Sequence, residues 1–159
     1  MMERVLLLAC GNPLRGDDAA GWWIAEAVRE RLSSAEIEVA ACQQLTPEMA
    51  ERVSHAECVI FVDATASAQP GSVSFEPLAE ARAAPAALTH HLHPAALLEL
   101  ARLLYGRTPR RAFALLIGGQ SFSLAQELSE PARRALPEAI RKIEAFVTQR
   151  TAKSLADGI

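Results

Sequence analysis

This sequence has few cysteines, no long hydrophobic run and no excess of positive charge, and each shortage excludes a class of protein. Three cysteines in 159 residues, without a Cys-x-x-Cys spacing, do not predict a disulfide framework or a zinc module. A net charge of −3 provides no basic surface for nucleic acid. The apolar run at residues 5–10 is too short to cross a membrane or to act as a secretion signal. We therefore expect a cytoplasmic protein without a nucleic-acid or membrane partner.

Common catalytic signatures are missing too. The sequence contains neither His-Glu-x-x-His nor Gly-x-Ser-x-Gly, and no Cys–His pairing signature, which argues against a self-sufficient hydrolase. Cys10, Cys42 and Cys58 each lie in or at the end of an expected strand. They are interpreted as small buried side chains in a reducing compartment rather than as a disulfide or a zinc site.

What the sequence does contain is an alternation of apolar strand-like and amphipathic helix-like segments. Strands are expected at 5–10, 37–42, 58–62, 72–78 and 111–119, and helices at 17–32, from Thr46, at 95–105, and after Pro131 or Pro137. This order predicts an α/β fold with a mostly parallel sheet. The segment 72–78 is expected at the sheet edge because it contains Pro77. It is also expected to run antiparallel to the third strand.

The chain length predicts a single domain. Residues 1–150 form that domain, and residues 151–159 are expected to be a disordered tail because they lack a core-facing pattern. No internal repeat or linker interrupts the sequence.

The loop between the first strand and the first helix ends in two adjacent carboxylates, Asp17 and Asp18. Aspartate is favoured at a helix start because it accepts hydrogen bonds from free N–H groups and complements the helix dipole. A phosphate-binding loop is disfavoured, because the third glycine after Gly11 and Gly16 is missing and two negative charges occupy its place. Helix capping and chemistry at a cleft both remain open for this pair.

A third carboxylate, Asp63, terminates the third expected strand. Ligand sites in parallel sheets lie beyond the carboxyl ends of the strands. Asp18 and Asp63 should therefore meet at one edge of the sheet, which favours chemistry over capping.

Three of the four histidines lie close together before the helix that begins near Pro94. His93 takes the N-cap position, whereas His90 and His91 precede it in an extended segment and point to opposite sides. Capping and surface hydrogen bonding are the simple interpretation of such a cluster. Neutral imidazole is also a common metal ligand and general base.

Taken together, these segments resemble the nickel–iron hydrogenase maturation proteases. The resemblance rests on Gly11-Asn12-Pro13-Leu14-x-x-Asp17-Asp18-x-x-Gly21, Phe61-Val62-Asp63-Ala64, Thr89-His90-His91-Leu92-x-Pro94-x-x-Leu97-Leu98 through Leu104-Tyr105-Gly106, Gln44-Leu45-x-Pro47-Glu48 and Gly119-x-Ser121-Phe122. It covers most of the chain in order. Ala19-Ala20 depart from it, because glycine commonly follows the acid pair, and the extra His90 and His93 complicate the histidine assignment.

The resemblance implies a twisted, mostly parallel five-stranded sheet with helices on both faces, in three layers. It also implies a cytosolic endopeptidase that removes the C-terminal extension of the hydrogenase large subunit after nickel insertion. Asp18, Asp63 and His91 would be the catalytic and metal-contacting residues. The nickel would arrive on the substrate precursor, no organic cofactor would be needed, and a monomer is expected.

Two carboxylates and one imidazole form an incomplete ligand set, which suits a metal held mainly by the substrate's own thiolates. The metal would polarise the scissile carbonyl or activate a water, with Asp18 or Asp63 as a base. Two alternatives stay open. One is a hydrolase that carries its own zinc on the same residues. The other is a non-enzymatic, flavodoxin-like binding module in which the aspartates only cap a helix.

Overall fold

A five-stranded sheet forms the centre of the computed structural model, which describes residues 3–78, 92–125 and 127–157. Its strands are β1 (Val5–Cys10), β2 (Ile37–Cys42), β3 (Cys58–Thr65), β4 (Val73–Pro77) and β5 (Arg111–Gly118). They lie in the order β2-β1-β3-β5-β4. The strands β2, β1, β3 and β5 are parallel to one another, and β4 runs antiparallel to its neighbour β5. This confirms the predicted mostly parallel sheet.

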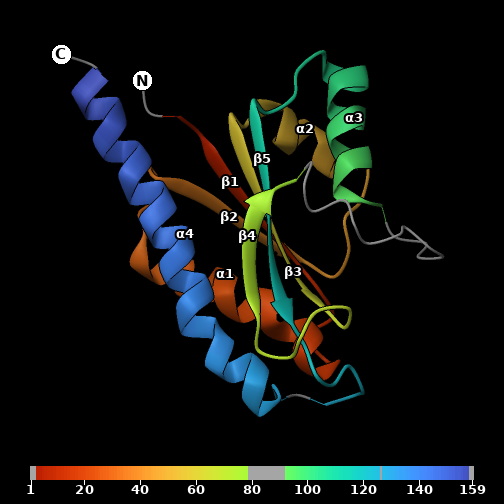
Figure 1. Cartoon of the computed structure of the whole chain (residues 1–159). Coiled ribbons are helices and arrows are strands. Elements are labelled where there is room, and N and C mark those ends of the chain that lie inside the picture. The colour runs from red at the N-terminus through yellow and green to blue at the C-terminus, as the bar shows by residue number, and fades with distance from the viewer. Residues whose placement is uncertain (1–2, 79–91, 126, 158–159) are drawn as a thin grey trace.

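Helices cover both faces of this sheet. They are the short 3-10 helix η1 (Gly16–Ala19), α1 (Ala20–Arg31), α2 (Met49–His55), α3 (Pro94–Tyr105) and α4 (Glu130–Asp157). The helices α1 and α4 lie against one face, and α2 and α3 lie against the other (Figure 1). The result is the expected α/β fold in three layers.

The central strand shows why the apolar runs in the sequence are continuous. Leu7 and Ala9 of β1 pack towards α1 and α4, whereas Leu6 and Leu8 pack towards α2 and α3. All four side chains are at most 1% exposed. A strand that is buried on both faces needs apolar residues at every position rather than at alternate ones.

Two elements differ from the sequence-based expectation. The edge strand β4 pairs with β5, not with β3, because β5 returns to the sheet between them. The helix α4 continues to Asp157 and so includes most of the stretch that was expected to be a disordered tail. Just before this stretch, the Arg150 guanidinium lies 4.9 Å from the Phe146 ring and forms an ion pair with Glu3. In the described ranges, we find no helix that combines the length and the apolar character needed to cross a membrane.

Candidate functional site

The two adjacent carboxylates after β1 have different environments. Asp17 is fully buried in η1 and accepts four hydrogen bonds, from the backbone N–H groups of Gln120 (2.7 Å), Ser121 (3.1 Å) and Ser129 (2.7 Å) and from the Ser129 hydroxyl (2.7 Å). Burial by itself would raise the pKa of Asp17, but these hydrogen bonds outweigh it and hold the pKa below its usual range. Asp17 therefore ties η1 to the segment between β5 and α4.

Asp18 is half-buried and lines a cavity at the sheet edge. Its Oδ2 accepts a hydrogen bond of 2.7 Å from the Asn12 backbone N–H, so the loop that precedes η1 orients this carboxylate. Gly11 makes the tight approach possible. It has a φ of +148°, and a Cβ at this position would collide with the Asp18 carbonyl oxygen. The Trp22 indole N–H also donates to the Gly11 carbonyl at 2.7 Å, which holds the loop against α1.

Asp63 lies near the carboxyl end of β3, which continues two residues beyond it. Its side chain is exposed, but it opens into the same cavity, where surrounding protein atoms displace part of its hydration. This desolvation raises the pKa of Asp63 to about 7, and the negative charge of Asp18 adds to the rise. The Ala64 N–H donates to Oδ1 at 2.8 Å and opposes the rise. Asp63 can therefore exchange a proton near neutral pH.

The cavity has a volume of about 330 Å³ and lies beyond the carboxyl ends of β1 and β3, beside the start of α3. Its lining includes Cys10, Asp18, Gln44, Asp63, Leu92 and His93. The structure thus brings together Asp18 and Asp63, which are 45 positions apart in the sequence, at the predicted edge of the sheet. Gln44, on the connection after β2, was not recognised as part of the site by sequence reasoning.

His93 is the histidine that the structure describes at this cavity. It is the N-cap of α3, and its Nδ1 accepts a hydrogen bond of 3.1 Å from the Ala95 N–H, as the position before Pro94 predicts. His91, the predicted third site residue, lies outside the described residues, as does His90. Among the described side chains, no group of three or more His, Cys, Asp or Glu residues is arranged to hold a metal ion.

A pair of cysteines at the same edge was not anticipated as a pair. Cys10 and Cys42 are the last residues of β1 and β2, are partners in register, and place their Sγ atoms 3.3 Å apart. The hydrogen bond between the thiols raises the pKa of Cys10 and lowers the pKa of Cys42. Burial raises the pKa of Cys10 further, as do the negative charges of Cys42, Asp63 and Asp18. Only Cys58 has the fully buried environment that the sequence predicts for all three cysteines.

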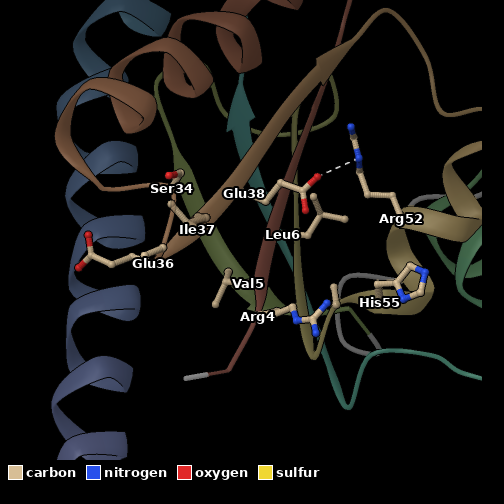
Figure 2. A pocket seen from close by; sticks show the side chains of 11 residues that line it. Arg4, Val5, Leu6, Ser34, Glu36, Ile37, Glu38, Arg52 and His55 are labelled. Atoms are coloured by element: carbon tan, nitrogen blue, oxygen red, sulfur yellow. Dashed lines mark ion pairs between the residues drawn. The ribbon is translucent and has the colours of Figure 1, made fainter. Parts of the chain in front are cut away.

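A second, smaller cavity of about 140 Å³ lies at the opposite end of the sheet, where β1 and β2 begin. Figure 2 shows that Arg4, Glu38, Arg52 and His55 surround it. Arg52 and Glu38 form an ion pair of 2.9 Å in which both side chains are more than half exposed. Because parallel sheets place ligand sites at the carboxyl ends of strands, the cavity with Asp18 and Asp63 is the better candidate site.

Neither a protein-family model nor a curated protein matches this sequence. Solved structures do match, over nearly the whole chain. The hydrogenase maturating endopeptidase HybD from E. coli is 22% identical, with 92% of this chain and 93% of that chain covered and a TM-score of 0.75. The [NiFe] hydrogenase maturation protease HybD from Thermococcus kodakarensis is also 22% identical, with 91% and 99% covered and a TM-score of 0.70. A hydrogenase 2 maturation peptidase from a Thaumarchaeota archaeon is 27% identical, with 91% and 98% covered and a TM-score of 0.62.

This chain has the fold of the hydrogenase maturation proteases. The match confirms the resemblance that the sequence motifs indicate, and with it the five-stranded, mostly parallel α/β architecture. In this maturation-protease fold, Asp18 and Asp63 occupy one cavity at the carboxyl edge of the sheet.

Proposed function

We propose that this protein is an endopeptidase that removes the C-terminal extension of a nickel–iron hydrogenase large subunit after nickel insertion. The observation that carries the proposal is the pair Asp18 and Asp63 in one cavity of a maturation-protease fold. The proposed partner is the nickel-loaded precursor, recognised through its nickel, and the proposed location is the cytoplasm. No organic cofactor takes part, and the protein acts as a monomer.

The residues of the cavity fit a cation that arrives with the substrate. Asp18 and Asp63 are close enough for the charge of one to raise the pKa of the other, and a cation between them relieves this repulsion. Carboxylate oxygens alone leave most coordination positions open, so the substrate's own ligands can stay on the nickel. His91 is the proposed third contact. The nickel supplies positive charge that polarises the bond to be cut.

Asp63 is the proposed general base. Without a cation in the cavity, burial holds the pKa of this carboxyl at about 7. The nickel of the substrate lowers that pKa, so the carboxyl is ionised and can accept a proton from a water molecule that attacks the scissile carbonyl carbon. The same carboxyl then carries the proton that the leaving amine requires. Asp18 is oriented by the Asn12 N–H and positions the substrate in the same cavity.

The test is processing of a nickel-loaded precursor by purified protein, followed by intact mass. Wild type should shorten the precursor. Asp63→Asn should reduce the rate at least 100-fold, which is the usual contribution of general-base catalysis, and Asp18→Asn should also reduce it, because it removes a proposed contact to the nickel. Glu26→Gln is a matched control, because it removes a carboxylate from the exposed surface of α1, where Glu26 is 66% exposed. Processing by Asp63→Asn at the rate of the Glu26→Gln control would reject the proposal.

A further inference from the structure

Cys10 and Cys42 already lie in nearly the arrangement that a disulfide requires. Their Sγ atoms are 3.3 Å apart, and their Cα atoms are direct partners on neighbouring parallel strands. Neighbouring strands are about 4.8 Å apart, which lies within the Cα separation of about 4.4–6.8 Å found in disulfides. Bond formation needs the sulfurs to approach by about 1.3 Å, to the bonded distance of about 2.04 Å.

The surroundings of the pair single it out from the third cysteine. Cys10 and Cys42 are both partly exposed, and Cys10 lines the cavity, so a small molecule can reach the pair. Cys58 is fully buried at the other end of the sheet, where its register partners are Val5 and Arg111. It has neither access to solvent nor a neighbouring thiol in register.

We propose that Cys10 and Cys42 form a reversible intramolecular disulfide, and that hydrogen peroxide is the oxidant. One thiol, as its thiolate, attacks a peroxide oxygen and becomes a sulfenic acid, and the other peroxide oxygen leaves as water. The second thiol attacks the sulfenic sulfur and expels its oxygen as a second water. Two thiols and one peroxide thus give one disulfide and two waters. A neutral oxidant is favoured over the anionic glutathione disulfide, because the negative charges of Asp18 and Asp63 act on Cys10.

The disulfide also reaches the candidate site. The Cys42 carbonyl accepts a hydrogen bond of 3.0 Å from the Gly11 N–H, and the adjacent Asn12 N–H holds Asp18. The disulfide therefore fixes the ends of β1 and β2 to each other at the point where the loop that orients Asp18 begins. If the proposed function is correct, processing should fall in the oxidised protein and return after reduction.

The test treats the full chain with hydrogen peroxide and maps the disulfide by differential alkylation and peptide mass. We expect a Cys10–Cys42 linkage, a loss of two hydrogens in the intact monomer, one free thiol at Cys58, and full reversal by dithiothreitol. Cys42→Ser should lose this linkage, and Cys58→Ala should keep it. If either variant fails to fold, the mapping of the wild-type chain decides by itself. Three free thiols, a sulfinic acid at either position, or a linkage between two molecules would overturn the proposal.

A parallel cleavage assay separates the two proposals. A mapped disulfide with at least a tenfold, reversible loss of processing supports both. A mapped disulfide in a protein that cuts in neither state supports the modification site and rejects the endopeptidase. A mapped disulfide with undiminished processing overturns the link between the cysteine pair and Asp18.

Discussion

Replacing Asp17 by asparagine should destabilise the fold much more than the same change at Asp18. The Asp17 Oδ2 accepts bonds from Gln120, Ser121 and the Ser129 hydroxyl, and Oδ1 accepts from the Ser129 N–H. Asparagine retains one oxygen, but its NH₂ group must then face at least one of these donors. Because all the donors point at the carboxylate, no orientation of the amide satisfies them.

The magnitude follows from the lost bonds. A hydrogen bond to a charged group contributes about 1.5–3 kcal/mol, and a buried donor left without a partner costs about 1–3 kcal/mol. Asp17→Asn should therefore lower the free energy of unfolding by about 3–5 kcal/mol. Asp18 accepts one backbone hydrogen bond and is half-buried, so Asp18→Asn should cost about 1 kcal/mol.

Urea unfolding followed by circular dichroism at pH 7 measures both values. The difference between wild type and Asp17→Asn should shrink in acid, because a depressed pKa gives stability above the ordinary value of 3.8 that is lost as the pH falls through the lower, folded-state value. An Asp17→Asn protein within 1 kcal/mol of wild type, or an Asp18→Asn protein equally destabilised, would refute the division of roles between the two acids.

Four further substitutions test the site. Asp63→Asn should flatten the pH dependence of the melting temperature and be at least as stable as wild type above pH 7. The folded-state pKa of Asp63 is about 7, against an ordinary value of 3.8, so the protonated carboxyl stabilises the wild-type fold at low pH. This stability is lost as the pH rises through 7. Melting curves from pH 5 to pH 8 check this, and a parallel pH dependence in both proteins would contradict it. His93→Ala should lower the free energy of unfolding in urea by about 1 kcal/mol, because it removes the acceptor that caps α3 at the Ala95 N–H. A loss below about 0.3 kcal/mol would contradict a capping role. His91→Ala should lose processing while His90→Ala keeps part of it, and full activity in His91→Ala would show that the histidine assignment is wrong.

Much of the fold was predictable because periodicity and topology act locally. Continuous apolar runs predicted β1 and β3, and the parallel arrangement predicted that Asp18 and Asp63 lie at the same edge of the sheet, as they do. The N-cap role of His93 followed from Pro94 alone. These inferences need only the chain next to each residue and the direction of the strands.

Other features depend on contacts between distant segments. Which of Asp17 and Asp18 faces inward is decided by the chain around Ser129, more than 100 residues later, which supplies the donors. The pairing of β4 with β5 likewise requires knowing where β5 enters the sheet.

The sequence contains a signal for the cysteine pair. The strands expected at 5–10 and 37–42 have equal lengths, and both end in cysteine. If the two strands are neighbours in register, their last side chains must lie together, as the pairing of Cys10 with Cys42 shows. Strand order cannot be derived from these two segments alone, so the sequence predicted three separate buried thiols instead.

The central claim is that this protein cuts a hydrogenase large-subunit precursor that carries nickel. The direct measurement incubates metal-free purified protein with the same precursor in a nickel-loaded and a nickel-free form and records the intact mass of each. We predict that the nickel-loaded precursor loses its C-terminal extension as one fragment while the nickel-free precursor keeps its full mass. Equal cleavage of both forms, or no cleavage of the nickel-loaded form, would contradict the account.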